Sequence, residues 1–423
     1  MAALKKPGDT LILKPNDGTQ GDGIFLVRSP ADLDRLLGRQ TQSVVLQRYL
    51  GSPKLLPAPA PCPEGGGLKF DIRIYALVLS CVPKRFFLCR EGLVRVCSEA
   101  YEDPSSESGG TRCSRHLTNY SINKYEAGFE HNADPSQGGK GTKRSLVPVL
   151  AFLEAHEARG GDGGGDAAPR AGSEAAAADN GGGDAVRGSR FSAHAAWSQI
   201  ERLTARTLDA MTSQLASPSA PDVDGLRGPQ LWAPPREGST LWTNVQSAWD
   251  DAGWGEWRHK CFHLLGVDVM LDAAGRAYLL EVNCNPSLGI DAVHCTEGPY
   301  ASVPPPPPPS LAPLIDTATP LMKGRGTKTC KCRSHHRPHV HAVCPIDLTV
   351  KHAAVGGALT IVARDVAAAR SGASLCVADL ASGTGYVPLP VAEANELHAE
   401  CAAAAMNTAT GECVARVPAF NVS

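Results

Sequence analysis

Residues 68–80 read LKFDIRIYALVLS, and this stretch predicts a long strand because its side chains alternate in kind along its length. One face is apolar and carries Phe70, Ile72, Ile74 and Ala76. The other face carries Lys69, Asp71, Arg73 and Tyr75. Because a buried charge must be paired, the second face predicts a lined cleft. A sheet face in contact with water is the alternative.

A glycine-containing stretch lies toward the N-terminus. Residues 10–15 (TLILKP) predict a short strand, and GTQGDG at 18–23 then leads into a second one. Such a segment lets backbone N–H groups approach phosphate oxygens. It matches neither the P-loop nor the dinucleotide-binding fingerprint, because no GK[ST] follows and no helix opens after the last glycine. A plain turn is therefore the alternative. A third strand, SVVLQRYL, follows at 43–50.

A hairpin is predicted further along the chain, at 261–288 (CFHLLGVDVMLDAAGRAYLLEVNCNPSL). If Ala274 and Gly275 form a two-residue turn, Asp268 lies opposite Glu281, with the carboxylates roughly 5 Å apart. Like charges so close cannot both stay ionised without a cation. Carboxylate and amide oxygens, including that of Asn283, suit Mg²⁺. A shift in register would move the pair, and a solvated face of an edge hairpin is the alternative.

Residues 116–124 (HLTNYSINK) are polar and have no internal period. Asn119, Ser121 and Asn123 carry amide and hydroxyl groups of the kind that orient a substrate, although an ordinary loop would look the same. Residues 192–215 predict a helix, with Ser192 as a plausible N-cap.

Composition narrows the function classes. The chain of 423 residues is long enough for one large domain or two ordinary ones. Lys and Arg number 41 against 43 Asp and Glu, a net charge of -2, which argues against a globally basic nucleic-acid binder but leaves a local basic patch open. We expect no membrane span and no secretory leader. The 14 scattered cysteines favour reduced thiols in the cytosol.

Taken together, these segments resemble the tubulin–tyrosine-ligase-like family of ATP-grasp amide ligases, and its polyglutamylase branch. The matching stretches are KPNDGTQGDGI, LQRYL, KFDIRIYALV, REGLVR, HLTNYSINK, GVDVMLD and LLEVNCNPSL. The resemblance implies an α+β, ATP-grasp fold of mostly antiparallel sheets with flanking helices, lacking most of the N-terminal subdomain and carrying disordered insertions.

The expected organisation follows from that resemblance and from composition. The catalytic region would span 1–300, with low-complexity insertions at 158–190 and 216–240. A Pro-rich and Cys/His-rich insertion would span 301–345, and a closing helix 346–369. An Ala-rich tail at 370–423 has no assigned structure.

The resemblance also implies a role for each matching residue. Arg73 and Arg95 would be catalytic, at the reacting phosphate and the amino-acid carboxylate. The residues expected to bind ATP are Lys14, Gln20, Gly21, Gln47, Arg48, Tyr49, Leu50, Lys69, Phe70, Asp71, Thr118 and Asn119. Those expected to bind the amino acid are Arg95, Tyr120, Ser121 and Lys143. Those expected to bind Mg²⁺ are Asp268, Glu281 and Asn283.

The implied activity is ATP-dependent polyglutamylation of tubulin. A carboxylate of the tubulin C-terminal tail would attack the γ-phosphate of ATP, and the amine of free L-glutamate would attack the resulting acyl phosphate. SINK at 121–124 resembles the glutamate-adding members, and Gln20 resembles the chain-elongating ones. The expected partners are microtubules, with no nucleic acid and no membrane. The expected location is the cytoplasm and cytoskeleton, at the axoneme or basal body of a cilium or flagellum.

Other functions stay open. One is a related ligase that adds another amino acid or modifies a non-tubulin protein. Another is a non-catalytic microtubule-binding remnant, which a missing N-terminal subdomain would favour and intact Lys14, Lys69 and Asp268 argue against. Binding of an acidic tail also requires a positively charged cleft surface, for which we expect Arg73, Arg95, Lys143 and Arg144.

The family resemblance gives no role to one Cys/His cluster. The cluster consists of Cys330, Cys332, His335, His336, His339, His341 and Cys344. These are zinc-capable ligands, but their spacing matches no standard finger. A solvated basic insertion is the alternative, and its basic residues would equally suit docking on an acidic tubulin tail.

Overall fold

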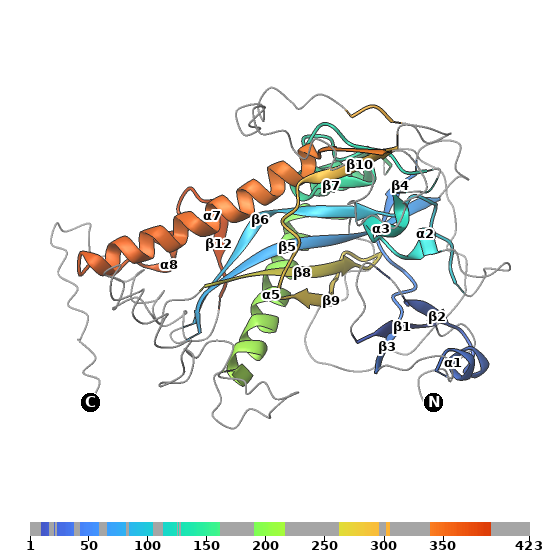
Figure 1. Ribbon diagram of the computed structural model, residues 1–423, viewed down its shortest axis with the longest axis horizontal. Helices are drawn as coiled ribbons and strands as arrows, with labels where there is room; N and C mark the ends of the chain where they lie inside the picture. Colours follow the sequence, from blue (N-terminus) through green and yellow to red (C-terminus); the bar gives the residue numbers. More distant parts are fainter. Residues whose placement is uncertain are drawn as a thin grey trace. The chain divides into compact units, whose positions relative to one another are not determined.

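The computed structural model describes residues 10–16, 21, 23–37, 43–58, 66–81, 84–104, 113–124, 126, 128–160, 190–215, 262–295, 302–304 and 339–390 (Figure 1). The chain divides into two compact units. The first comprises Met1–Phe70, Val94–Ser198 and Leu271–Ala277, and the second comprises Asp71–Leu93, Gln199–Met270 and Tyr278–Ser423. Each unit is described by itself.

A small antiparallel sheet opens the first unit. Its strand order is β2 (Phe25–Val27), β1 (Leu11–Pro15) and β3 (Val44–Arg48). Helix α1 (Pro30–Leu37) begins at a cap in which Ser29 Oγ accepts a hydrogen bond from Asp32 N–H at 3.1 Å. The helix covers one sheet face, where Leu33 and Leu36 pack with Leu11, Leu13 and Val27.

The rest of the first unit consists of short elements and two longer helices. These are β4 (Leu55–Pro57), α2 (Cys113–His116), α3 (Tyr120–Asn123), β7 (Lys143–Ser145), α4 (Leu146–Gly160) and the start of α5 (Ala193–Leu215). The predicted cap of α5 is confirmed, because Ser192 Oγ accepts a hydrogen bond from Ala195 N–H at 3.3 Å.

A seven-stranded sheet carries the long strands. Its path is β12 (Tyr386–Pro388), β6 (Lys84–Val96), β5 (Gly67–Cys81), β8 (His263–Leu271) and β9 (Ala277–Asn283), with β4 paired to β5 and β7 to β6. Strands β5 and β8 are antiparallel, and Arg73 is the register partner of Asp268. A separate antiparallel pair joins β10 (Asp291–Cys295) to β11 (His339–Val343).

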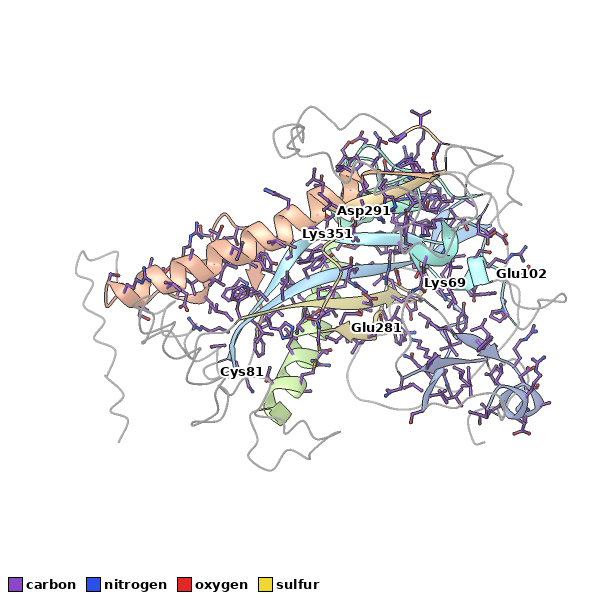
Figure 2. All side chains as sticks on the ribbon, viewed as in Figure 1. Lys69, Cys81, Glu102, Glu281, Asp291 and Lys351 are labelled. Carbon is purple, nitrogen blue, oxygen red and sulfur yellow. The ribbon has the colours of Figure 1, made fainter. Side chains whose placement is uncertain are left out.

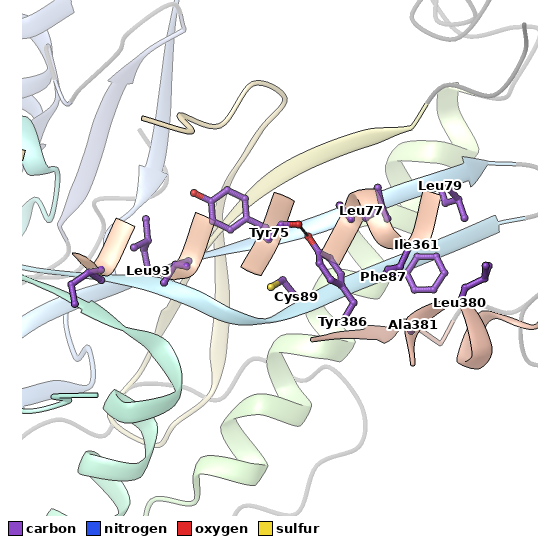
Figure 3. Close-up of a cluster of buried hydrophobic side chains, with 14 of the residues drawn as sticks. Tyr75, Leu77, Leu79, Phe87, Cys89, Leu93, Ile361, Leu380, Ala381 and Tyr386 are labelled. Carbon is purple, nitrogen blue, oxygen red and sulfur yellow. Dashed lines mark hydrogen bonds between the residues drawn. The ribbon is translucent and has the colours of Figure 1, made fainter. Parts of the chain in front are cut away.

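The core of the second unit lies between the sheet and the C-terminal elements. Helix α7 (Pro345–Arg370) contributes Ile346, Val350, Ala354 and Ile361 to a cluster with Tyr75, Leu77 and Phe87 of the long strands (Figure 3). Helix α8 (Val377–Ala381) and β12 complete it with Leu380 and Tyr386. Tyr386 Oη donates to Ala354 O at 2.7 Å.

Helix α7 is long and apolar enough, by length and composition, to cross a membrane, with a mean hydropathy of 1.3 over an 18-residue window that is 50% buried. Core helices pass the same test, and one face of α7 packs against the cluster described above. The helix is also tied to the segment after β9. Lys351, which is labelled in Figure 2, pairs with Asp347 at 2.7 Å and also donates to Gly289 O.

The α+β class with antiparallel sheets is confirmed, whereas several boundaries were wrong. Helix α4 continues to Gly160, so an insertion beginning at 158 starts too early. The segment 301–345 includes strand β11, which is paired rather than inserted. The closing helix predicted at 346–369 corresponds to α7, and part of the unassigned tail forms α8 and β12. The insertions at 161–189 and 216–240 and the tail beyond 390 lie outside the described residues.

The hairpin turn also differs from expectation. Asp272 N–H donates to Arg276 O at 2.9 Å and Gly275 N–H donates to Asp272 O at 2.8 Å. Gly275 has a φ of 77°, the left-handed conformation that closes a three-residue loop. The turn therefore contains Ala273, Ala274 and Gly275 instead of two residues. The predicted register, which relied on the shorter turn to place Asp268 opposite Glu281, is wrong at this end.

Candidate functional site

The charged face of β5 is buried. Lys69 and Asp71 are each 3% exposed, and the Arg73 side chain is 12% exposed. The apolar face is buried as well, with Phe70 at 1%. The alternative of a solvent-facing sheet is therefore excluded for these residues. Because burial penalises an unpaired charge, their partners show how the site is built.

Lys69 is held by side chains of the first unit. Its ammonium donates to Tyr49 Oη at 2.7 Å and lies 4.2 Å from the centroid of the Tyr49 ring. Tyr49 Oη is in turn 3.0 Å from His116 Nδ1. Tyr49 was predicted to bind ATP, and its side chain is directed at Lys69.

Lys14 is placed on the small sheet of the same unit. Its Nζ donates to Gln47 Oε1 at 3.0 Å, so two residues predicted to bind ATP are brought together. The register explains the contact, because Lys14 pairs with Val45 and Gln47 is two residues further along β3. Arg48 is exposed and Leu50 is half-buried. Gln20 lies outside the described residues.

The glycine stretch meets the segment at 116–124. Gly21 has a φ of 85°, and a Cβ there would stand 2.7 Å from Ile122 Cδ1 and 3.2 Å from Asn119 Cγ. A side chain at position 21 would be strained, would displace Ile122 and would crowd Asn119. Two stretches separated by about a hundred residues in sequence are therefore packed against each other, as expected if both serve one ligand.

Asn123 has a structural role, which corrects its assignment as a group that orients a substrate. It is 1% exposed, and its Oδ1 accepts from both the N–H and the hydroxyl of Ser98 at 2.8 Å. Its Nδ2 donates to Leu117 O at 2.7 Å and Asn119 O at 3.0 Å. The amide is fully used in shaping the loop that carries Thr118 and Asn119.

In the second unit, Arg73 lies between the predicted metal ligands. Its Nη2 donates to Asp268 Oδ2 at 2.8 Å, and its Nε donates to Asp268 Oδ1. The same Nη2 is 3.9 Å from Glu281 Oε1. Asn283 Nδ2 donates to Glu281 Oε1 at 3.1 Å. The cation that the two carboxylates require is thus supplied by Arg73 itself.

Gly266 has no side chain, and this leaves space for the Arg73 side chain. A Cβ at this position would stand 2.8 Å from Pro286 Cβ and 3.0 Å from Arg73 Cδ. Gly266 is also the register partner of Tyr75, two residues from Arg73 on β5. A glycine inside a strand pattern is a signal of close approach, so the sequence could have indicated this residue.

The donor set fits Mg²⁺ by its chemistry, because Asp268, Glu281 and Asn283 offer hard oxygen ligands. The Glu281 side chain is 53% exposed and can be reached, whereas both Asp268 oxygens accept from Arg73. Among the described residues, no group of three or more His, Cys, Asp or Glu side chains could hold a metal ion. The Asn283 amide is therefore needed to make a set of three.

The residues predicted to bind the amino acid lie together in part. Lys143 Nζ is 4.5 Å from the centroid of the Tyr120 ring, and Ser121 follows Tyr120 on α3. Lys124, which was not predicted, lies 5.4 Å from the same ring. Arg95 is half-buried on β6. Tyr120 therefore lies within cation–π range of two lysine side chains.

Arg144 does not line a cleft, and its assignment to a positively charged cleft surface was wrong. The residue is 2% exposed, and its guanidinium donates to Gly141 O at 2.6 Å and Gly138 O at 2.8 Å. Burial lowers the pKa of Arg144 to about 10. Its role is to anchor the loop before β7.

Only the C-terminal end of the Cys/His cluster, from residue 339 on, lies within the described residues. Its members Cys330, Cys332, His335 and His336 lie outside the described residues. His341 Nδ1 is 2.7 Å from Asp291 Oδ2, and Cys344 is buried at the start of α7. A zinc site and a solvated basic insertion both stay open as interpretations of this cluster.

The fold and the site together define a class, an α+β protein with an ATP-grasp-like arrangement of antiparallel sheets. The model of the tubulin-tyrosine ligase family matches residues 2–154 and 255–297. The chain belongs to this family.

The similar curated proteins include three polyglutamylases. Over 298 residues the chain is 29% identical to tubulin polyglutamylase TTLL11 of Homo sapiens, which covers 70% of this chain and 31% of that protein. The chain is 31% identical over 280 residues to a probable beta-tubulin polyglutamylase of Tetrahymena thermophila. This match covers 66% of the chain and 17% of the Tetrahymena protein. The chain is also 31% identical over 287 residues to tubulin polyglutamylase TTLL7 of Homo sapiens. This match covers 68% of the chain and 24% of TTLL7. The chain therefore spans less than a third of the length of these relatives.

Proposed function

We propose that this chain is an ATP-dependent tubulin polyglutamylase, which joins free L-glutamate to glutamate side chains in tubulin C-terminal tails. The observation that carries the proposal is the buried charged face of β5, with Lys69 held by Tyr49 and Arg73 held between Asp268 and Glu281. The names of the similar proteins support tubulin as the acceptor. The proposed location is the cytoplasm and cytoskeleton, at the axoneme or basal body of a cilium or flagellum.

The proposed reaction has two steps. An oxygen of the acceptor carboxylate bonds to the γ-phosphorus of ATP while the bond to the bridging oxygen breaks, which releases ADP. The amine of glutamate then bonds to the acyl carbon, and the carbon–oxygen bond to phosphate breaks. No side-chain nucleophile is required, so catalysis depends on positioning and charge.

The chain's own residues supply that charge. Lys69 and Lys14 would hold the phosphates, and Arg73 and Arg95 would neutralise the transferred phosphoryl group and the carboxylates beside it. Asp268, Glu281 and Asn283 would hold Mg²⁺, which would stabilise the developing charge on phosphate oxygens when bound. Tyr120, Ser121 and Lys143 would border the glutamate. SINK at 121–124 and Gln20 support glutamate as the donor and chain elongation as the mode.

Oxygen-isotope transfer tests the mechanism. An acceptor peptide carrying ¹⁸O in its side-chain carboxylates is incubated with the chain, ATP, Mg²⁺ and glutamate. We expect one ¹⁸O atom in each released phosphate and a peptide that gains glutamyl units. Released phosphate without ¹⁸O would contradict the acyl-phosphate route. Equal amounts of glycine and tyrosine are included in the mixture, and their incorporation in preference to glutamate would contradict the donor.

A further inference from the structure

A buried row of three side chains lies behind the lysine that is proposed to hold the phosphates. Lys69, Tyr49 and His116 are 3%, 7% and 2% exposed, respectively. They come from β5, from the residue after β3 and from the end of α2. The distances are 2.7 Å from Lys69 Nζ to Tyr49 Oη and 3.0 Å from Tyr49 Oη to His116 Nδ1. Lys69 is labelled in Figure 2.

The chemistry of the groups fixes the direction of the first hydrogen bond. A lysine ammonium can only donate, so Tyr49 Oη is the acceptor of the first bond. The hydroxyl proton of Tyr49 is then available for a second hydrogen bond, and His116 Nδ1, 3.0 Å from Tyr49 Oη, is placed to accept it. Burial raises the pKa of the Tyr49 hydroxyl far above its usual range, which keeps that proton in place. An Nδ1 that accepts this proton belongs to the tautomer with its own proton on Nε2.

The His116 ring is also fixed by packing. The Tyr49 and Tyr101 rings lie edge-on to it, with centroids at 5.9 Å and 5.7 Å. Tyr101 Oη donates to Gly51 O at 2.6 Å, two residues after Tyr49. The imidazole therefore cannot turn without moving both tyrosines. Because a lysine side chain is long and flexible, it loses conformational entropy when it binds a phosphate. A rigid support that already holds the lysine in place makes this loss smaller.

We propose that Tyr49 and His116 are positioning residues, which hold the Lys69 ammonium in the place and orientation needed for the ATP phosphates. The inference rests on the proposed function, and it assigns Tyr49 a role through its hydroxyl in addition to any contact of its backbone with the base. His116 belongs to none of the expected ligand sets. It acts only through Tyr49, and so it affects the grip on the phosphates without touching them.

Titration calorimetry on the full chain tests the proposal, with ATP and adenosine as the two ligands. Tyr49→Phe and His116→Leu remove the donor and the acceptor of the second hydrogen bond. We expect each to weaken ATP binding about tenfold, the usual effect of a hydrogen bond to a charged group, and to leave adenosine binding unchanged. His116→Asn places an amide oxygen where Nδ1 stands and should keep ATP binding within about threefold of the parent.

A matched control is Tyr386→Phe, which removes an equally buried hydroxyl that donates to Ala354 O. It should leave the affinity for ATP unchanged. The inference is overturned if Tyr49→Phe and His116→Leu bind ATP like the parent, or if they lose adenosine and ATP equally, as a structural role requires. Tyr49→Phe alone decides the matter if His116→Leu does not fold. A parent chain that binds adenosine and ATP equally, or binds neither, would instead overturn the proposed function, and this inference with it.

Discussion

At Arg73 one guanidinium lies against two carboxylates and supplies a positive charge to both. Asp268, whose side chain is 3% exposed, receives two of the arginine's N–H donors, and Glu281 is 3.9 Å from one of them. A buried pair of this kind is weak evidence for stability, but removing one partner is costly. The two carboxylates therefore differ: Asp268 is buried and accepts from Arg73 at both oxygens, whereas Glu281 is 53% exposed and can be reached by a ligand.

The first prediction concerns Glu281. The change Glu281→Gln keeps the size of a 53% exposed side chain and removes one charge from the proposed Mg²⁺ ligands. We expect ligation to fall on the order of 100-fold with the thermal unfolding midpoint unchanged. Asp34→Asn, an exposed change on α1, is the control. Ligation near the parent rate in Glu281→Gln would remove the metal assignment.

The second prediction concerns the Arg73–Asp268 pair. We expect Arg73→Gln to lower the free energy of unfolding by about 3 kcal/mol, because the Asp268 carboxylate loses both guanidinium donors while it remains buried. Adding Asp268→Asn should restore more than half of that loss, since the charge that needed the donors is gone. Urea unfolding of the two single variants and the double variant measures the coupling. Strictly additive losses would show that the two side chains do not depend on each other.

The third prediction follows from the buried position of Arg144. We expect Arg144→Glu to lower the free energy of unfolding by more than about 3 kcal/mol, because a carboxylate would face the Gly138 and Gly141 carbonyls. Lys140→Glu reverses an exposed charge in the same segment and should change it by less than about 0.5 kcal/mol. If Arg144→Glu were as stable as the parent and lost only microtubule binding, the cleft assignment would be reinstated.

At the scale of elements, α7 carries two neighbouring glycines that face different surroundings. A Cβ at Gly357 would stand 2.4 Å from Thr384 O and 2.8 Å from the Tyr386 ring, whereas nothing lies within 4 Å at Gly356. We expect Gly357→Ala to destabilise the chain by about 1–3 kcal/mol by displacing β12. Gly356→Ala should stabilise it by about 0.5–1 kcal/mol, the propensity gain alone. Unfolding midpoints of the two variants check this, and similar shifts in one direction would contradict the packing of β12 on α7.

The elements also show how much the sequence could reveal. The alternating period of residues 68–80 is long enough to predict β5 and its charged face. The turn of the β8–β9 hairpin was missed because Gly275 suits both a two-residue turn and a three-residue loop, and only hydrogen bonds distinguish them. Strand β12 has three residues and no readable period. His116 was missed because its partners, Tyr49 and Tyr101, are brought to it only by the fold.

At the scale of the whole molecule, we expect binding of a polyacidic tail to depend on a local arrangement of charge, because the net charge of -2 offers no general attraction for it. The family and the α+β fold follow from sequence patterns that run through the chain. The roles of individual side chains do not, as Arg144 and Asn123 show: both are polar residues that the sequence suggested for a ligand site, and both prove to be buried supports of the backbone.

Mass spectrometry of tubulin C-terminal peptides is the direct test of the proposed polyglutamylase activity. Microtubules are incubated with the chain, ATP, Mg²⁺ and isotopically labelled glutamate, and Glu281→Gln is run in parallel. The account predicts tail peptides that gain labelled glutamyl residues in successive steps, only with ATP, and with a yield on the order of 100-fold lower for the variant. A parent chain that binds ATP and microtubules but adds no mass to the tails would contradict it and would favour a non-catalytic microtubule-binding protein.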